Sequence, residues 1–583
     1  MIEDPLALAI LAIVVISVAT AIAPKVRIAG PLILVMVGIV VSLLPFVPPV
    51  EVDPEFIIVG VLPPLLYSAA VNLPAVEFRR DFGPVVGLAV ILVVLSALAL
   101  AFFFQAVLPS LDFMLALALG AILSPTDAVA TSIVKRLGIS SRVVTLLEGE
   151  SLLNDATSLV VLRTAVAASA VGASTVVQEV EGVARPGFIG AFVWGVIAAL
   201  IVGGIIGWIN LRVRALISNP AANTAIGFVV PFAAYLPTEQ LGGSGLVAAV
   251  VAGIVTGQGS ARWFTPDQRL SDKVNWRTVE LVLEGAVFLV MGLELKEIVR
   301  ANGESEEGIW HGVWLAAVAL AIVLVVRTAY VTFIVWLQSR RARVRRRKLG
   351  EIERRLNHVA AEPSRGSARG RRNPEHVERR MDLLRRRVRT TLADIDYYNA
   401  SPLGWKHGTV IVWAGMRGVV TLAAAQTLPH DTPERALLVF VAFLVAVGSL
   451  MLQGFTLPAL VRVLRIDPPD ESLDRAQQNR LDAELRTAAA SALAETTHRQ
   501  DGTPYPAELT ARVGERLTRP PEDDETALTR DLLELRITMI EAMRARLVEL
   551  SSGGEFSSET LRHALAELDA DQLSLELRLR GEE

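Results

Sequence analysis

Long apolar runs constrain this chain more than any other feature of its sequence. Residues 6–22 and 311–337 are apolar over roughly the twenty residues that a helix needs to cross a bilayer, and similar runs recur along the chain. Hydrocarbon offers no water to the backbone, so each crossing must satisfy its own amide and carbonyl groups, as a helix does. We therefore expect an all-α membrane protein that crosses the membrane many times.

Composition supports this class and excludes several functions. The 583 residues are 52% hydrophobic, which is too apolar for an ordinary soluble protein. The chain has no cysteine, so it can have no disulfide, no thiol catalysis and no thiolate metal site. Glu3 and Asp4 precede the first run, and this acidic flank is not that of a cleaved signal peptide.

The apolar pattern predicts thirteen transmembrane helices. Loops after odd-numbered spans carry Lys and Arg, whereas loops after even-numbered spans are poor in them, as in "NGESEEG". By the positive-inside rule, the protein is a multi-pass plasma-membrane protein with its N-terminus outside and its C-terminus in the cytoplasm. The predicted spans are 6–23, 31–47, 55–73, 84–108, 112–134, 145–172, 188–210, 221–237, 243–258, 278–297, 310–337, 404–427 and 435–463.

Two segments outside the spans are polar. Within a transmembrane domain over 1–465, the loop 339–403 is rich in arginine; it either binds anionic lipid or an acidic partner, or serves only as a stop-transfer signal. Residues 466–583 contain four helical patterns and no GxGxxG motif, so we expect a helical cytoplasmic domain for assembly or stability that binds no nucleotide.

Ionisable residues at membrane depth indicate functional sites. In span 5, Pro125 should break the helix beside Ser124, Thr126 and Asp127. Irregular backbone at this depth is tolerated where it lines a cavity, and broken helices are a common way for transporters to bind ions. A simple proline kink is the alternative, and the adjacent aspartate disfavours it.

In span 6, "EGESLLNDATS" places carboxylates in a run that is otherwise largely apolar. On a helix, Ser151 and Asp155 share one face, and Glu150 and Asn154 share the next. A hydroxyl and a carboxylate are hard oxygen ligands suited to an alkali cation, and imidazole and thiolate are absent. Glu148, at the helix entrance, is explained as a partner of the helix dipole.

In span 12, Arg417 lies mid-span between Gly415 and Gly418. A buried guanidinium stays charged and needs an anion, and Glu150 is the expected partner. Spans 5 and 12 are each the fifth of six, in 1–6 and in 8–13, which predicts two inverted six-helix repeats whose discontinuous helices cross at the ion site.

The segments "SPTDAVATS", "EGESLLNDATSLV" and "GMRGVVTLAAA" resemble signature segments of the monovalent cation/proton antiporters, in the electroneutral sodium/proton exchanger branch. The resemblance covers residues 5–465 and implies a homodimer, with spans 4–6 and 11–13 as a mobile core and spans 1–3 and 7–10 as a scaffold. It also implies that Asp155 binds Na⁺ and H⁺ in turn, that Ser151, Thr126 and Asp127 line the site, and that Glu150 pairs with Arg417.

Two positions depart from the family pattern. Ser68 stands where many relatives carry an acid, and Glu284 is an extra carboxylate in span 10. The role of Glu284 does not follow from the sequence.

Charge counting predicts the stoichiometry. Low dielectric disfavours the charged carboxylate, so Asp155 can hold either a proton or a cation. Since Asn154 precedes it and is no second acid, one H⁺ exchanges for one Na⁺ with no net charge moved. Li⁺ or K⁺ can compete, so a K⁺/H⁺ antiporter is an alternative; a cation channel and a scaffold with a structural membrane anchor are alternatives from other classes. We expect no enzyme activity, no cofactor and no nucleic-acid partner.

Overall fold

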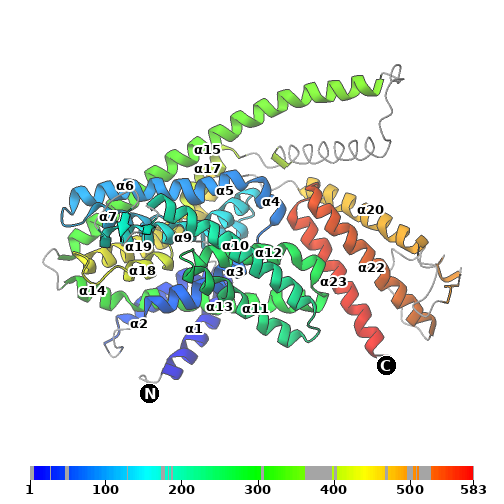
Figure 1. Ribbon diagram of the computed structural model, residues 1–583, viewed down its shortest axis with the longest axis horizontal. Coiled ribbons are helices and arrows are strands. Elements are labelled where there is room, and N and C mark those ends of the chain that lie inside the picture. The colour runs from blue at the N-terminus through cyan, green and yellow to red at the C-terminus, as the bar shows by residue number, and fades with distance from the viewer. Residues whose placement is uncertain are drawn as a thin grey trace.

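The computed structural model describes residues 5–581, except for residues 27, 46, 48–51, 128, 172–177, 181–182, 186–187, 304–307, 362–396, 399–402, 467–470, 496–502, 507 and 511–526. The described chain is almost entirely helical. Its sheet is a hairpin of two antiparallel strands, β1 (Gln178–Val180) and β2 (Val183–Arg185). Most helices run along the long axis of the molecule, and the last three gather at one end (Figure 1).

Helices occupy every segment predicted to span the membrane. In the first half they are α1 (Pro5–Val26), α2 (Gly30–Ser42), the π-helix η1 (Phe56–Val61) with α3 (Leu62–Val71), α4 (Ala75–Arg80), α5 (Phe82–Val86), the π-helix η2 (Gly87–Ile91) with α6 (Leu92–Val107), the interrupted pair α7 (Phe113–Leu123) and α8 (Val129–Arg136), and α9 (Ser141–Val171).

The second half has the same character. It contains α10 (Phe188–Ala215), α11 (Pro220–Gln240), α12 (Gly245–Trp263), α13 (Pro266–Leu293), α14 (Leu295–Gly303), α15 (Gly308–Ala361), the interrupted pair α17 (Trp405–Trp413) and α18 (Val419–Gln426), and α19 (Arg435–Leu464).

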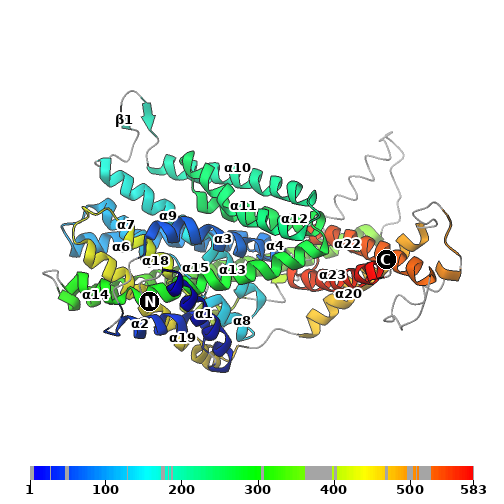
Figure 2. The same cartoon turned by 90° about the horizontal axis from the view of Figure 1, so that it is seen from below.

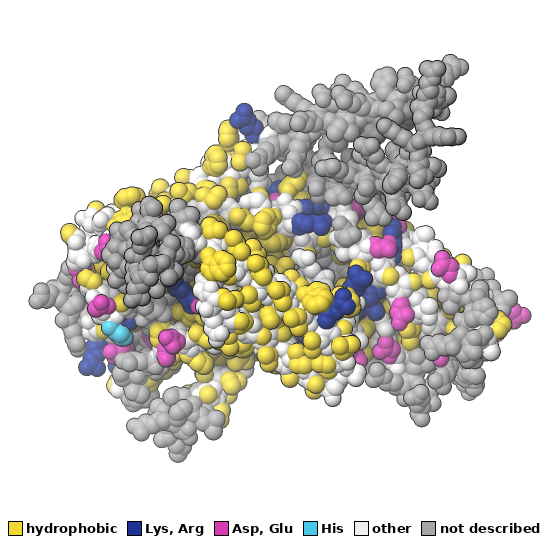
Figure 3. Space-filling model, viewed as in Figure 1, with side chains coloured by type: hydrophobic (Ala, Val, Ile, Leu, Met, Phe, Trp, Pro, Cys, Tyr) yellow, Lys and Arg dark blue, Asp and Glu magenta, His cyan; other side chains and the backbone are white. Residues whose placement is uncertain are grey.

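The all-α membrane class is confirmed. Among the described residues, five helical stretches are long and apolar enough to cross a membrane on their own, and α2, the η1–α3 stretch and α7 are shorter apolar helices. Hydrophobic side chains cover much of the middle of the visible face, whereas charged side chains are seen mainly toward its two ends (Figure 3). The count of thirteen spans and the inverted repeat stay predictions. The five stretches are Ala9–Val26, Phe82–Val107, Phe192–Ala215, Gly308–Arg340 and Arg435–Leu464.

Local sequence explains where helices begin and how closely they pack. Thr265 and Gln268 form a capping box at the start of α13, each side chain accepting a hydrogen bond from the other's backbone amide at 3.0–3.3 Å. A Cβ on Gly207 of α10 would lie 2.9 Å from the carbonyl oxygen of Ala252 on α12, so only glycine allows this approach. Small residues commonly let membrane helices pack at such short range.

The polar C-terminal segment is helical as expected. It contains α20 (Glu471–Glu495), α22 (Ala527–Gly553) and α23 (Ser558–Gly581), which share a hydrophobic core that includes Leu481, Ile540 and Leu561. Figure 2 shows these helices together at one end of the molecule, away from the hairpin. One of the four helical patterns predicted for this segment, over 506–518, lies mostly outside the described residues. Most of the basic loop 339–403 beyond the end of α15 lies outside them as well.

Candidate ion-binding site

The two predicted helix breaks are present, and they touch. Residues 124–127 separate α7 from α8, and residues 414–418 separate α17 from α18. The backbone amide of Asp127 donates to the carbonyl oxygen of Met416 at 2.7 Å. Backbone groups freed by one break are thus satisfied by the other, as burial in a bundle requires.

Asp127 lies where two helices begin. Its Oδ1 accepts a hydrogen bond from the amide of Val129, the first residue of α8, at 3.2 Å. Its Oδ2 occupies the place that a Cβ on Gly418 would take, directly before α18. A carboxylate at helix N-termini is favoured by the positive end of the helix dipole.

Arg417 lies where two helices end. Its Nε donates to the carbonyl of Leu123, the last residue of α7, at 3.2 Å, and its Nη1 donates to the carbonyl of Gly415, just past α17. Its backbone amide donates to Ser449 Oγ of α19 at 2.9 Å. The side chain is buried, so this cation compensates the negative ends of two half-helices.

The predicted ion pair between Glu150 and Arg417 is wrong. Both terminal guanidinium nitrogens of Arg327, on α15, donate to Glu150: Nη1 to Oε1, and Nη2 to Oε2 at 2.9 Å. Arg327 also donates from Nε and Nη2 to the carbonyl of Ile411 in α17 at 3.1 and 2.9 Å. Two parallel bonds suit the planar guanidinium, so this buried pair is well matched. Arg417 lines a narrow buried gap together with both side chains.

The error came from looking for the partner only in interrupted helices. Arg327 lies in the apolar run "AIVLVVRTAYV", and α15 continues through it without a break. A lone arginine in the middle of a long apolar run is enough to indicate a buried ion pair, because such a charge must find an anion in the bundle.

Thr126 and Asn154 connect the first break to α9. The Thr126 hydroxyl donates to Glu150 Oε1 at 3.0 Å and accepts from Asn154 Nδ2 at 2.7 Å, and the same Nδ2 lies 3.1 Å from the Thr126 carbonyl oxygen. Both side chains are buried behind the cavity wall. Among the described residues, Asn154 Oδ1 has no hydrogen-bond partner.

Asp155 and Ser151 face a cavity. Both line an open space of about 2720 Å³, together with Pro125 and Asp127 of the first break. Within the described part of the chain, Asp155 makes no hydrogen bond or ion pair. The structure therefore brings Asp155 and Ser151 to one wall, as the helical spacing predicted, with Asp127 of the first break lining the same cavity and Thr126 and Asn154 just behind it.

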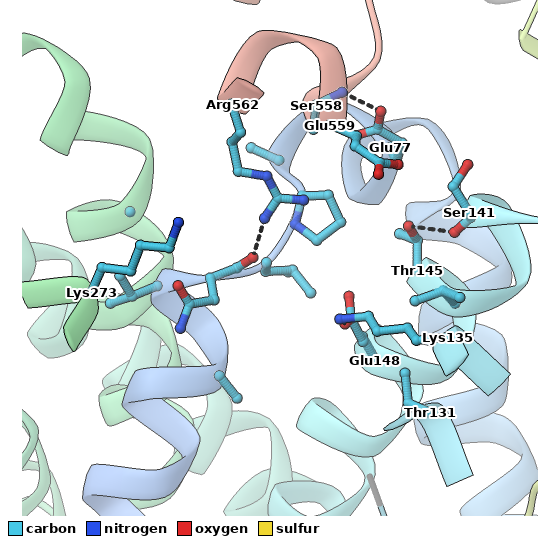
Figure 4. Close-up of a pocket in the computed structure, with 18 of the residues that line it drawn as sticks. Glu77, Thr131, Lys135, Ser141, Thr145, Glu148, Lys273, Ser558, Glu559 and Arg562 are labelled. Carbon is cyan, nitrogen blue, oxygen red and sulfur yellow. Dashed lines mark hydrogen bonds and ion pairs between the residues drawn. The ribbon is translucent and has the colours of Figure 1, made fainter. Parts of the chain in front are cut away.

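The cavity extends from Asp155 to the tail. Glu280 and Glu284 of α13 line it as well, which places the unexplained Glu284 on the route to Asp155. Ser68 is buried nearby on α3. Figure 4 shows the mouth: Lys273 lies on one side and Lys135 beside Glu148 on the other, below the first turn of α23.

Comparisons with known proteins identify the family. The sequence profile described as "sodium/hydrogen exchanger, transmembrane" matches residues 11–463. The chain belongs to the sodium/hydrogen exchanger family. It is therefore a membrane-embedded cation/proton antiporter, and the resemblance of its signature segments is confirmed.

Relatives extend over nearly the whole chain. An uncharacterized Na⁺/H⁺ exchanger of Mycobacterium tuberculosis is 26% identical over 98% of this chain and 97% of its own. The exchanger YjcE of Escherichia coli is 28% identical over 92% of each chain. A sodium, potassium, lithium and rubidium/H⁺ antiporter of Bacillus pumilus is 25% identical over 74% of this chain and 57% of its own.

A solved structure shares the fold. The sodium proton antiporter MjNhaP1 of Methanocaldococcus jannaschii superposes with a TM-score of 0.55 over 79% of this chain and 98% of its own, at 16% identity. At that identity the likeness concerns the fold alone.

Proposed function

We propose that this exchanger carries one Na⁺ in exchange for one H⁺, and that the two compete for Asp155. One observation carries the proposal. Asp155 is the carboxylate of α9 that faces the cavity without a partner among the described residues, whereas Glu150 is bound by Arg327. A carboxylate without a partner in low dielectric needs a cation or a proton, and it has room for one positive charge at a time.

The proposed Na⁺ ligands are oxygens around Asp155. Ser151 lies one helical turn before Asp155 on the same face and lines the same cavity. Thr126 is the third proposed ligand. Its hydroxyl donates to Glu150 and accepts from Asn154, which leaves one oxygen lone pair for a cation that moves from the cavity past its wall. Asp127 holds the helix ends at the site, and the free Oδ1 of Asn154 offers one more acceptor.

Electroneutral exchange follows from the charges that do not change. Glu150 and Arg327 cancel each other, and Asp127 and Arg417 face helix ends of opposite sign. Among these charged groups of α9 and the two breaks, Asp155 is the one left to alternate between a proton and Na⁺, so the loaded site has the same charge in both directions.

The positions of basic residues support the proposed orientation. Arg212 and Arg214 fall in the last turn of α10, and Lys135 and Arg136 in the last turn of α8. Lys135 lines the mouth toward which the tail lies. We place this end in the cytoplasm of a plasma-membrane protein, so that the cavity opens toward the cytoplasm. A homodimer is proposed separately, from the family resemblance.

Proton-gradient dissipation in proteoliposomes tests the proposal. Na⁺ should collapse an imposed pH gradient, and the apparent KM for Na⁺ should rise as the solution becomes more acidic while the maximal rate stays the same. A membrane potential should not change the rate at equal gradients. A KM for Na⁺ that does not depend on pH, or a current without a pH gradient, would contradict competition at Asp155; the second result would favour a channel.

Potassium is the second candidate substrate. The Bacillus pumilus relative is named for potassium, lithium and rubidium as well as sodium, and oxygen ligands alone do not fix ionic radius. Titration of the same vesicles with K⁺ and Li⁺ decides the order, since K⁺ exchange at a lower KM than Na⁺ would make this a K⁺/H⁺ antiporter.

A further inference from the structure

The last helix of the chain lies across the mouth of the cavity. Arg562, Leu565 and Asp569 of α23 line the same space as Asp155. Figure 4 shows Ser558 beside Glu77 at the rim, and Arg562 reaching down from α23 into the opening. Arg562 Nη1 donates to the carbonyl of Asn72, the residue that ends α3, at 2.7 Å.

The first turn of α23 and the first turn of α4 cap each other. The backbone amide of Val76 donates to Ser558 Oγ at 2.9 Å, and the backbone amide of Ser558 donates to a carboxylate oxygen of Glu77. Ser558 and Glu77 are both buried, and Val76 joins the hydrophobic core of the tail. Each helix thus satisfies an amide that a helix start leaves without an intrahelical partner.

Further along, α23 is fastened to α13. Arg269 Nε donates to Asp569 Oδ2 at 2.8 Å, and its Nη2 forms an ion pair with Oδ1. Both side chains are largely buried, at 9% and 17% exposure, so this pair is better shielded than an ordinary surface pair. From Ser558 to Asp569 is about 16 Å along a helix, which is the span between the two attachments.

The helix α4, which binds the first turn of α23, also contacts α9, the helix that carries Asp155. Asp81 follows α4 directly and accepts two hydrogen bonds, each of 3.0 Å, from Arg142 of α9. Both side chains of that pair are buried. Phe78 of α4 packs on α9 so closely that a Cβ on Gly149 would lie 3.2 Å from its ring.

We propose that α23 is a strap that holds the α9 wall of the cavity to the α13 wall and thereby slows the movement that transport requires. The inference rests on the proposed function, because alternating access requires the wall with Asp155 to move relative to α13. With α4 bound to α9 and Asp569 bound to Arg269, that movement strains or breaks at least one attachment. Release of the strap should therefore favour the state that opens to the other side.

A single cysteine can report that state without any transport measurement. The native chain contains no cysteine, so no background labelling needs to be removed. Leu159 lies one turn beyond Asp155 on the same face of α9, on the side away from the mouth, and it is buried. Leu159→Cys should become accessible to a membrane-impermeant maleimide, added from the side opposite the tail, only when the site opens there.

Charge reversal then breaks the ion pair between Asp569 of α23 and Arg269 of α13. In full-length Leu159→Cys protein in vesicles, Asp569→Arg and Arg269→Asp should each raise the labelling rate about three- to tenfold. The double reversal should lower it again, though only part of the way, because Arg544 Nη2, which lies 3.7 Å from Asp569 Oδ1, would repel an arginine at position 569. Asp571→Arg is the matched control: it makes the same charge change on α23 at an exposed side chain.

The labelling results test the strap independently of which ion the protein transports. Equal labelling in Asp569→Arg, Arg269→Asp and Asp571→Arg would overturn the proposal, and so would a rise that the double reversal does not rescue, since that indicates general loosening. If Na⁺-driven exchange is absent from wild-type vesicles, the proposed function fails while the labelling result still decides whether α23 restrains the wall. Where exchange is present, its rate should rise with labelling in the single reversals.

Discussion

Glu150 and Asp155 lie on the same helix, about 7.5 Å apart along its axis, and have opposite surroundings. Glu150 is buried and receives three hydrogen bonds, two of them from Arg327 and one from Thr126. Asp155 faces the cavity and has no partner among the described residues. One side of α9 therefore holds a carboxylate with fixed charge compensation, and the other keeps a carboxylate free for a transported ion.

The strongest test of this contrast is Asp155→Asn. The substitution keeps the size and polarity of the side chain and removes its titratable charge, so exchange should fall to the level of empty vesicles. Because Asp155 makes no hydrogen bond or ion pair with the described residues that the amide would lose, the melting temperature in detergent should stay the same or rise. Na⁺-driven dissipation of a pH gradient and thermal unfolding of the same preparation measure both. Residual exchange above background would remove Asp155 from the central role.

A second test moves the helix ends that meet beside Asp155. A Cβ on Gly418 would take the place of Asp127 Oδ2, so Gly418→Ala must displace Asp127 or the start of α18. A displacement of about 1 Å at a working site can cost on the order of 100-fold in rate.

Gly448→Ala is the matched control for that test. It lies in α19, where an added Cβ would meet no atom within 4 Å. Exchange rates measured side by side should drop steeply for Gly418→Ala and stay near wild type for Gly448→Ala. Similar rates for the two variants would mean that the close fit of Asp127 against Gly418 has no part in transport.

A third test concerns the compensated carboxylate. Arg327→Met leaves Glu150 buried without its cation and should lower the free energy of unfolding by about 3–5 kcal/mol. Glu150→Leu combined with Arg327→Met removes both charges and should recover most of this loss. Unfolding in mixed SDS micelles gives the values.

The corresponding double-mutant cycle separates the two candidate arginines. The coupling between Glu150 and Arg327 should be on the order of 2–3 kcal/mol, whereas Glu150 and Arg417 should couple by much less. A larger coupling to Arg417 would restore the pairing expected from the sequence and contradict the bidentate contact with Arg327.

The contrast between the two carboxylates also shows what the sequence could predict. Helical spacing was enough to place Ser151 with Asp155 and Glu150 with Asn154, and Pro125 and the two glycines around Arg417 were enough to locate both breaks. These are local properties, set by residues within one or two turns.

Partners distant in sequence were harder to predict. Arg327 reaches Glu150 from 177 positions away, and nothing in its own run indicates which carboxylate it faces. The docking of Ser558 on Val76 joins residues 482 positions apart, and the tail's helical pattern gave no sign of it. Charge balance showed that Glu150 needed a cation, but only the position of α15 in the bundle, from which the Arg327 side chain reaches Glu150, decided which arginine supplies it.

The smallest expected effect lies toward the C-terminal end of α9. Arg163 forms an ion pair with Glu239 at the end of α11, and Glu239 Oε1 also accepts from the amide of Gly245 at 2.8 Å. The pair joins α9 to the neighbouring helices on the side where Leu159 is closed off. Since the Arg163 side chain is 46% exposed, breaking the pair should cost only about 0.2–1 kcal/mol.

Arg163→Gln should therefore raise labelling of Leu159→Cys from the side opposite the tail by less than about fivefold and leave the melting temperature nearly unchanged. A charge reversal, Arg163→Glu with Glu239→Arg, should bring labelling back toward the wild-type rate. A rise well above tenfold would mean that this pair is the main interaction that keeps the side opposite the tail closed. Arg163 would then be a third kind of charged group on α9, which holds the conformation, whereas Glu150 stabilises the bundle and Asp155 binds the ion.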